Sequence, residues 1–466
     1  MMSTAEPLDG EREAVRRSYG ARFAAVAVFV VVGVALALFD FFSLNSETAN
    51  RGFDGHSAPV YGQYRPNLSA MAWIAVGVAI AAAVATVLML RAKRTRPWVA
   101  VAVGVGILFT LSLSLAVARP DRQGIPGRTV RVQAGEYQVD VGLVDRLGPY
   151  TFVRDYPQIV PQLRSHSITH PPGALLLLYA LQDLSPAHLI PRALALGLLA
   201  SLVVGSTWLV ARHFADESTA NIAALLIAVA PGPAILTFTC MDALFAAVLG
   251  LVAALFVWGK RSGNTRIAFV AGLAAGFAAF VTYAVSFIAI FGAIWFFVRL
   301  RRKQAATLLA WSAGGALLAV ALMRLAGFDV LASYHAFSAA VAITPFQRTR
   351  PYLYWIFGEY AVWLTYVGLP IAAAVVFTLF TKRRAFLLAV FVPIAIFYAL
   401  PTHVTKLIPG ETERTWLFLL PFAAAAAAAS FKSLVPPSKR AWIMGALVLF
   451  AALQAVLLNA LWLNFY

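Results

Sequence analysis

Cysteine and charged side chains are scarce in this chain. Only 12% of its 466 residues are Asp, Glu, Lys or Arg, about half the share found in soluble globular domains. A chain with so few charges has no room for a large soluble domain, and its polar segments are expected to be loops. The single cysteine, Cys240, excludes an intramolecular disulfide bond and any cysteine-based metal site.

Apolar side chains make up 61% of the residues instead, and the mean hydropathy is +0.79. Runs of about 17–25 apolar residues are long enough to cross a bilayer as helices, and we predict about thirteen such spans. The predicted spans lie near residues 21–41, 68–90, 98–118, 190–211, 218–236, 242–258, 266–282, 284–299, 305–325, 357–380, 384–400, 416–431 and 441–463. The expected fold class is all-α, a polytopic membrane protein with about 13 transmembrane helices.

The net charge of +17 gathers in short basic clusters at the ends of the apolar runs. These clusters are Arg16, Arg17 and Arg22; Arg91, Lys93, Arg94 and Arg96; Lys260 and Arg261; Arg299, Arg301, Arg302 and Lys303; Lys382, Arg383 and Arg384; Lys432, Lys439 and Arg440. Short basic loops stay in the cytoplasm, so the charge predicts topology, with anionic membrane lipids rather than nucleic acid as its partner. We expect a multi-pass protein of the plasma (inner) membrane with a cytoplasmic tail, residues 1–20, that is not a cleavable signal peptide.

The same topology separates the acidic residues. About six of the 20 fall on the cytoplasmic side, and the others lie at or beyond the outer surface. The long outer segments are residues 42–67, 119–189, 326–356 and 401–415. Carboxylates and histidines are costly next to a bilayer, so chemistry or binding is expected in these segments.

Residues 136–147, in the second outer segment, have the spacing of an amphipathic helix. Its apolar positions are Tyr137, Val141, Val144 and Leu147. Glu136 and Asp140, four residues apart, share another face, which would point to a cavity if the helix lies along the membrane surface. Gly148 and Pro149 end the helix. The alternative is a solvated surface helix.

A second short helix is predicted after His170-Pro-Pro-Gly173. Two prolines are incompatible with a helix before them and fit its first turn, so His170 is expected at the N-terminal end of the apolar run that follows. A helix N-terminus with a nearby cation suits a phosphate group. The alternative is a purely structural turn.

Taken in order, these features resemble the first outer loop of GT-C glycosyltransferases of the protein O-mannosyltransferase and aminoarabinose transferase type. The shared order is an acidic residue and an aromatic, a short helix, Gly148 with Phe152, a Tyr-Pro pair, and a basic residue before two prolines. In that family the acidic residue is the general base on the acceptor, and a lysine before two prolines contacts the phosphate of a polyprenyl-phosphate sugar. Glu136 and His170 stand at these two positions. The resemblance covers roughly residues 98–430 in layout.

The chain departs from this family at two points. The family has an Asp-Glu pair, whereas a glycine precedes Glu136 here, so Asp140 is an alternative base. The family loop follows the first span, whereas the loop at 119–189 follows the third. Residues 21–97 are therefore expected to form an added two-helix hairpin ahead of a GT-C-like module at residues 98–466.

Two further short motifs add to the resemblance. Asp242, in Cys240-Met-Asp242 at the outer start of a span, is similar to the family's Asp-Ala or Asp-Thr segment near the active-site cavity. The segment from Gly410 to Trp416 resembles a Gly-Glu-x-x-Arg-x-Trp pattern of actinobacterial membrane glycosyltransferases, in which Arg414 would hold a phosphate. The alternatives are a dipole-favoured helix cap at Asp242 and an interfacial anchor at Arg414.

The resemblance implies an inverting glycosyltransferase of cell-envelope biogenesis. It would move a mannosyl, arabinofuranosyl or similar sugar from a polyprenyl-phosphate donor to a glycan or glycolipid acceptor at the outer face. The implied catalytic residues are Glu136 and Asp140. The implied contacts to the donor phosphate are His170, Arg164, Arg348, Arg350 and Arg414, and those to the substrates are His166, Asp242, Glu411 and Tyr137. No cofactor is certain, and a dependence on Mg²⁺ or Mn²⁺ stays open.

Two other functions would use the same lipid-linked substrates. A transporter or flippase of a lipid-linked glycan would place ionisable residues within its spans and break its helices near the midplane. The predicted spans are nearly free of charge, with Arg324 and Glu359 as the nearest exceptions, both close to a span boundary. This distribution favours the enzyme. A glycan polymerase or ligase that uses a whole lipid-linked oligosaccharide shares the superfamily and remains an alternative.

Overall fold

The computed structural model describes residues 18–34, 62–92, 96–119, 137–184, 189–342, 352–400 and 410–464. Within these residues the regular structure is helical, apart from two short strands, β1 (Gly62–Tyr64) and β2 (Trp462–Asn464), which pair antiparallel. The expected all-α fold class is confirmed for the described part of the chain.

Seven stretches of the described residues are helical, long and apolar enough to cross a membrane. They are Ala72–Arg91 (α3), Pro97–Val117 (α4), Pro191–Phe214 (within α11, Leu189–Ser201, and α12, Val203–Phe214), Met241–Ser262 (α15), Arg302–Leu325 (α18), Thr412–Leu434 (α25, Thr412–Thr415; η4, Leu417–Leu419; α26, Leu420–Leu434) and Pro437–Leu461 (α27). The chain is therefore a multi-pass integral membrane protein, as its composition predicts.

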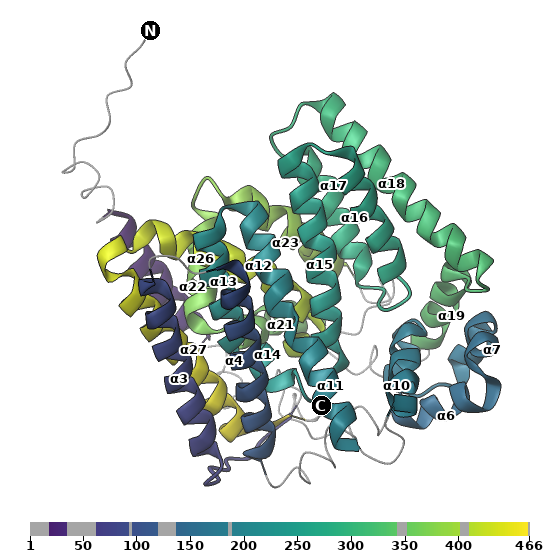
Figure 1. Ribbon diagram of the computed structural model, residues 1–466, viewed down its shortest axis with the longest axis horizontal. Coiled ribbons are helices and arrows are strands. Elements are labelled where there is room, and N and C mark those ends of the chain that lie inside the picture. Colours follow the sequence, from purple (N-terminus) through teal and green to yellow (C-terminus); the bar gives the residue numbers. More distant parts are fainter. Residues whose placement is uncertain are drawn as a thin grey trace.

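The other helices are shorter or bent, so the described residues do not present thirteen helices of crossing length. The shorter apolar ones are Ser18–Val34, α13 (Glu217–Val229), α14 (Pro231–Leu236), α16 (Thr265–Ala278), α17 (Val285–Phe297), α19 (Val330–Ala342) and α23 (Arg384–Ala399). Residues 137–184 form α6 (Gln138–Leu147), α7 (Pro149–Arg154), α8 (Tyr156–Ile159), η3 (Val160–Gln162), α9 (Ser165–Ile168) and α10 (Gly173–Leu184). In Figure 1, α6, α7, α10 and α19 lie together at one edge of the bundle.

The span predicted at 357–380 is bent rather than straight. Its two parts, α21 (Tyr352–Val367) and α22 (Leu369–Leu379), meet at 115°, and the pair would count as an eighth span. Gly368 has φ 93°, a backbone conformation that a side chain would oppose. Gln454 of α27 accepts a hydrogen bond from the Leu369 N–H and donates one to the Thr365 carbonyl, both at 2.9 Å. Backbone groups that the bend releases are thus satisfied inside the protein.

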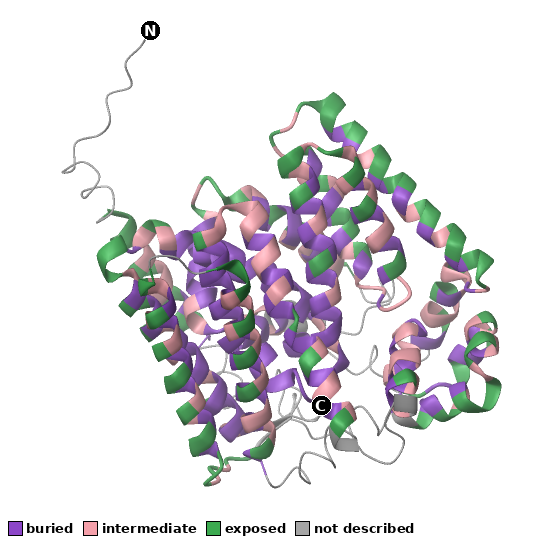
Figure 2. Cartoon of the chain, in the orientation of Figure 1, coloured by how far each residue is buried: buried purple, intermediate pink, exposed green. Residues whose placement is uncertain are grey.

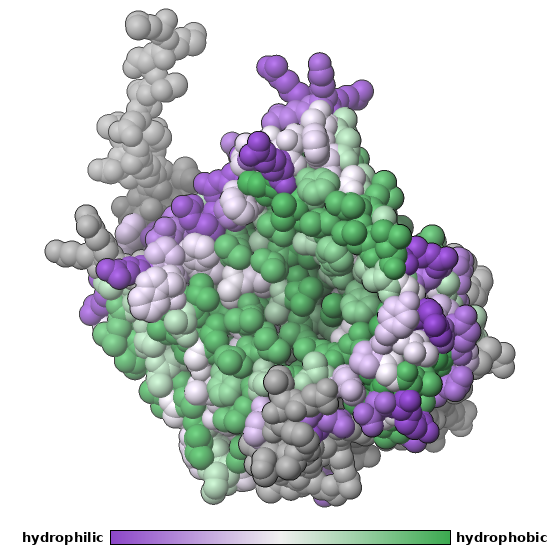
Figure 3. Space-filling view, turned by 45° about the vertical axis from the view of Figure 1, so that its right-hand side comes forward, coloured by the Kyte–Doolittle hydropathy of each residue, from purple (hydrophilic) through white to green (hydrophobic). Residues whose placement is uncertain are grey.

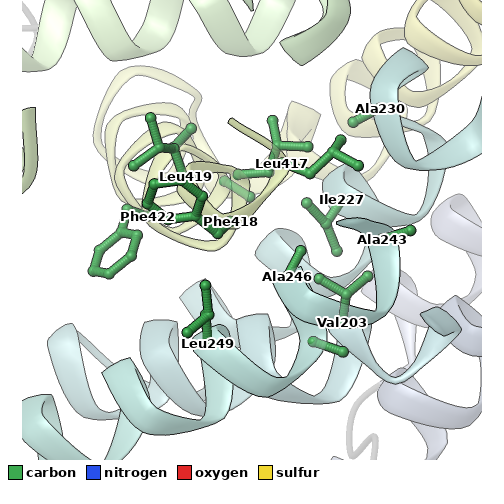
Figure 4. Close-up of a cluster of buried hydrophobic side chains, with 14 of the residues drawn as sticks. Val203, Ile227, Ala230, Ala243, Ala246, Leu249, Leu417, Phe418, Leu419 and Phe422 are labelled. Atoms are coloured by element: carbon green, nitrogen blue, oxygen red, sulfur yellow. The ribbon is translucent and has the colours of Figure 1, made fainter. Parts of the chain in front are cut away.

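Helix α26 is surrounded by protein. Residues 420–431 are all buried, and the alanine run that they contain allows close approach of α12, α13 and α22. Figure 2 shows buried residues concentrated on these central helices, with exposed ones along α3 and α18. Figure 4 shows side chains of α12, α13, α15 and residues 417–422 gathered in one apolar cluster beside it.

A buried arginine, Arg119, holds together the two segments that carry the strands. Arg119 donates hydrogen bonds to the carbonyls of Asn459 and Ala460, both at 2.9 Å, and to the carbonyl of Arg65 at 3.0 Å. The side chain of Arg119 thereby joins the end of α4 to both strand-bearing segments. Figure 3 shows a broad apolar belt between two polar ends of the molecule, the surface expected of a membrane-embedded bundle.

Candidate active site

Three charged side chains form a buried network where α15 begins. Arg414 donates from Nη1 to Asp242 Oδ2 at 2.8 Å, and from Nε and Nη2 to Glu411 Oε2 at 3.0 and 2.5 Å. The side chains of Arg414 and Asp242 are only 10% and 12% exposed. Charges as buried as these persist when they are paired and hydrogen-bonded. Because one cation faces two carboxylates, the ionised network carries net negative charge.

The turn before α15 fixes the carboxylate of Asp242. Cys240 caps the helix in an extended conformation, and its thiol donates to Asp242 Oδ2 at 2.8 Å while its sulfur accepts the Asp242 N–H at 3.4 Å. Asp242 lies in the first turn of α15, where the helix dipole also favours a negative charge. Asp242 therefore interacts favourably with the helix dipole and also pairs with Arg414.

The loop that carries Glu411 is held in a strained conformation by Glu359 of α21. Glu411 has φ 62°, in the left-handed region that few residues other than glycine adopt, and such strain clusters at functional sites. The Gly410 N–H donates to Glu359 Oε1, and the Thr412 hydroxyl donates to the Glu359 carbonyl, both at 3.0 Å. Glu359 thus sets the loop so that Glu411 meets Arg414.

His170 lies beside this network. Its ring centroid is 4.7 Å from that of Phe245, which follows Asp242 by about one turn of α15. Its Nδ1 is buried without a hydrogen-bond partner among the described residues. Burial, the largest cause, lowers the pKa of His170 to about 4; Asp242 opposes this shift, whereas Arg414 and His166 add to it. With this pKa the imidazole is neutral near pH 7.

The turn that carries His170 packs against the residues between α16 and α17. The Gly173 N–H donates to the Phe280 carbonyl at 2.9 Å, and a Cβ at Gly173 would lie 2.4 Å from that oxygen. Only glycine permits this approach. On the other side, the Tyr156 hydroxyl donates to the His170 carbonyl at 2.6 Å, and burial raises the pKa of that phenol well above its usual value. The predicted start of α10 after the two prolines is confirmed.

The amphipathic helix predicted at 136–147 is present as α6, and it ends at Gly148, which has φ 74°. The buried residues of its apolar face are Tyr137, Val141 and Val144. Leu147, in the last turn, is 41% exposed. Asp140 is 3% exposed and accepts the Arg164 N–H at 2.9 Å. Asp140 therefore ties α6 to the loop before α9, which differs from the predicted face toward an open cavity.

Aromatic rings connect α6 to the turn that carries His170. The Tyr137 ring centroid lies 6.1 Å from those of both His166 and His170, and it is nearly parallel to the His166 ring. The structure thus brings together six of the predicted site residues, from three separate parts of the sequence. They are Tyr137, His166, His170, Asp242, Glu411 and Arg414.

Two of the remaining predicted residues contact each other. The Arg164 side chain is exposed, and the Arg164 backbone N–H donates a hydrogen bond to Asp140. Glu136, Arg348 and Arg350 lie outside the described residues, so their predicted roles stay predictions.

Sequence reasoning missed the part that Glu359 plays. This residue is 2% exposed within an apolar helix, and an ionisable residue inside a membrane span is itself a signal of a site. The prediction noted it only as an exception near a boundary. Glu413 is also buried, with 1% of its surface exposed, but its position in a polar stretch of the sequence gave no indication of burial.

The described residues contain no cluster of three or more His, Cys, Asp or Glu side chains arranged to hold a metal ion.

Comparisons with known proteins include a distant structural likeness. No family model matches the sequence, and no curated protein matches it. The fold is similar to part of the crystal structure of the Archaeoglobus fulgidus oligosaccharyltransferase, solved in complex with zinc and sulfate, with a TM-score of 0.42 and 18% sequence identity. The likeness covers 67% of this chain and 48% of that one, so the chain spans about half the length of this solved protein.

Proposed function

We propose that this protein is an inverting GT-C-type glycosyltransferase of the plasma membrane. It would transfer a sugar from a polyprenyl-phosphate donor to a glycan or glycolipid acceptor at the outer face. The observation that supports this most is the convergence of three motifs that stand far apart in the sequence. The His-Pro-Pro-Gly turn, the Cys-Met-Asp start of α15 and the Gly-Glu-x-x-Arg loop meet in one buried polar cluster.

Glu136 is the proposed base. It would take the proton of an acceptor hydroxyl while the hydroxyl oxygen attacks the anomeric carbon from the face opposite the phosphate. The bond between the anomeric carbon and the phosphate oxygen breaks, and polyprenyl phosphate leaves with the electron pair. Phosphate is a good leaving group, so a single catalytic carboxylate suffices. Asp140, buried and bound to the Arg164 N–H, would orient the helix that follows Glu136.

The charge of the cluster constrains how the donor phosphate would bind. Arg414 is already shared by two carboxylates, so it offers little free positive charge to an anion. The charge of the phosphate would then be met mainly by Arg348, Arg350 and the exposed side chain of Arg164. His170 would contribute a neutral hydrogen bond. Substrate hydroxyls would be bound near Asp242 and Glu411, beside the rings of Tyr137 and His166.

A transfer assay tests the base. Purified protein in lipid would be given radiolabelled polyprenyl-phosphate mannose or arabinofuranose and a membrane glycolipid fraction, and the new glycosidic bond would be measured. Glu136→Gln should keep donor binding and lose at least the roughly 10²-fold typical of a general base. Asp140→Asn should cost less. If both variants retain full transfer activity, the proposal of a glycosyltransferase is wrong. If only Asp140→Asn is inactive, the base is Asp140, one helical turn after Glu136.

Donor binding is tested separately with Arg350→Ala and His170→Ala. Loss of one charge-assisted hydrogen bond is worth about 1.5–3 kcal/mol, or roughly tenfold to a hundredfold in affinity. Arg350→Ala should therefore weaken binding more than His170→Ala, because His170 is neutral. Arg154→Ala, at an exposed pair with Asp155, is the matched control and should bind donor normally. If Arg350→Ala and His170→Ala both bind the donor as tightly as the parent protein does, Arg350 and His170 do not belong to the donor site.

A transporter of a lipid-linked glycan is the second candidate, and one observation favours it. The 115° bend at Gly368, next to a helix that carries the buried Glu359, is the kind of broken helix that transporters use at their binding sites. Purified protein in sealed vesicles would be given a fluorescent glycolipid. Movement of the glycolipid across the membrane, without any new glycosidic bond, would support the transporter.

Both candidates assume that the loop at 119–189 faces outward. A cysteine introduced at Arg128 should react with an impermeant thiol reagent on intact cells, with the parent protein, whose Cys240 is 6% exposed, as the background. Labelling only after lysis would place the loop in the cytoplasm and contradict the proposal.

A further inference from the structure

A polar cavity lies at the other end of α15, away from the candidate active site. Its volume is about 410 Å³, within the range of small-ligand sites. The ends of α12, α15 and α17 and the turn between α22 and α23 form its walls. Its polar lining residues are Asp216, Lys260, Trp295, Arg299, Lys382 and Arg383.

The charge of this cavity is unbalanced. Four of its lining residues are cationic, and its single acidic one, Asp216, is already bound. Both carboxylate oxygens of Asp216 accept from Lys432 Nζ at 2.7 Å, and the Thr219 N–H adds a hydrogen bond at 2.9 Å. No ion pair joins any of the four cations to a carboxylate among the residues that the structure describes. Like charges that face one cavity repel one another, and an anion would relieve that repulsion.

Several of the donors are held in place by contacts that leave their charge available. Arg299 donates from Nη2 to the Lys382 carbonyl at 2.9 Å, and Arg383 donates from Nη1 to the Ala429 carbonyl at 2.7 Å. The Lys260 ammonium lies 3.4 Å from the centre of the Trp295 ring. These contacts are to neutral groups, so they position the cations without neutralising them.

Two further features single out this cavity. The Trp295 Nε1–H is buried without a hydrogen-bond partner among the described residues, and buried donors are nearly always satisfied by protein, water or ligand. Arg299 has φ 64°, a strained conformation outside glycine, and such strain is concentrated at ligand clamps and switches. A neutral ligand would satisfy the indole but leave the four cations unbalanced.

We propose that this cavity binds a phosphate group, carried either by the headgroup of a membrane lipid or by a soluble phosphate ester. A phosphate offers several acceptor oxygens to the lysine, arginine and indole donors and supplies the missing negative charge. The volume leaves room for a glycerol or sugar next to the phosphate. The site is independent of the proposed transferase, because none of its lining residues belongs to the cluster around Arg414.

Native mass spectrometry with phosphatidylglycerol tests the site. The double variant Lys260→Gln with Lys382→Gln removes two lining cations, and it should bind the lipid roughly tenfold or more weakly, as expected for loss of charged hydrogen bonds. The matched control, Arg302→Gln with Lys303→Gln, removes two cations at the start of α18 that do not line the cavity. It should bind like the parent protein. Equal binding by both double variants would mean general attraction to a basic surface and would overturn the proposal.

Trp295→Phe gives a milder second variant, since it keeps a ring under Lys260 and removes only the indole donor. It should weaken binding severalfold while Tm in the absence of lipid stays near that of the parent; unchanged binding would contradict a phosphate at this donor. Competition identifies the source of the phosphate. If sn-glycerol 1-phosphate and inorganic phosphate fail to displace the lipid, the ligand is a headgroup. If they displace it at submillimolar concentration, the ligand is a soluble ester.

Discussion

The two ends of α15 use charge in opposite ways. Asp242, in its first turn, is buried in a network with Arg414 and Glu411, whereas Lys260, in its last turn, faces a cavity with other cations. The two residues lie roughly 27 Å apart along the helix, at 1.5 Å per residue. At the first end both carboxylates depend on the same cation, so removing Arg414 leaves them uncompensated. At the second end the charges are unpaired, so removing one relieves repulsion and costs the fold little. The first end is arranged for fixed geometry, and the second for attraction of an anion.

The largest expected effect is the loss of a partner at the paired end. Arg414→Met leaves the Asp242 and Glu411 carboxylates without their cation, which typically costs roughly 3–5 kcal/mol of stability. Tm in detergent should fall strongly, and adding Asp242→Asn and Glu411→Gln to Arg414→Met should recover much of it. Asp155→Ala, at the exposed pair with Arg154, should leave Tm unchanged. Equal Tm values for Arg414→Met and Asp155→Ala would show that the stability of the protein does not depend on the buried network.

The paired end should also make stability depend on pH through His170. The folded pKa of about 4 lies below the ordinary value of 6.5, so between these values the unfolded chain binds a proton that the folded chain does not. Stability is therefore full above pH 6.5 and falls as the pH drops toward 4, by about 1.4 kcal/mol per pH unit and roughly 3 kcal/mol in all. His170→Gln should remove this component, measured as the difference between variant and parent in Tm at pH 7 and pH 4.5. An identical pH slope in both proteins would contradict a buried neutral imidazole.

A smaller effect is expected from the glycine that seats the His170 turn. Gly173→Ala would place a Cβ 2.4 Å from the Phe280 carbonyl oxygen, and overpacking of this kind costs about 1–3 kcal/mol. Gly142→Ala in α6 is the matched control, because its Cβ would meet nothing within 4 Å and alanine favours a helix over glycine by about 0.5–1 kcal/mol. The two variants should shift Tm in opposite directions. A shift of the same sign would mean that the turn adapts to the added methyl group.

The smallest effect should come from the ion pair beside the cationic cavity. The Lys432 and Asp216 side chains are 31% and 49% exposed, and pairs this exposed contribute about 0–1 kcal/mol. Lys432→Ala should therefore change Tm little, and less at high salt. A loss as large as that of Arg414→Met would remove the distinction between the two ends of α15.

Local rules predicted the elements that local residues determine. Gly148 and Pro149 end α6, and the two prolines after His170 precede α10, because backbone restrictions act within a few residues. Hydropathy also identified the multi-pass class. It did not locate the bend at Gly368, because a window of apolar residues reads the same whether the helix is straight or broken.

Contacts between distant segments set the rest of the site. Asp140 was expected to face a cavity, but the Arg164 N–H, 24 residues away in sequence, draws it into the packing. The role of Glu359 depends on Gly410, 51 residues further on, and no spacing rule relates the two. The neutral charge state of His170 likewise follows from burial beside Phe245, which the turn motif alone does not reveal.

The burial of α26 on all sides has a consequence for how the protein is made. Residues 420–431 contact other helices rather than lipid, and α12, α13 and α22, which surround them, are all synthesised earlier. The central helix is therefore synthesised after these neighbours and must insert between them. Enlarging an alanine of this run should consequently appear as a lower yield of assembled protein in the membrane, before any effect on catalysis or ligand affinity is measured.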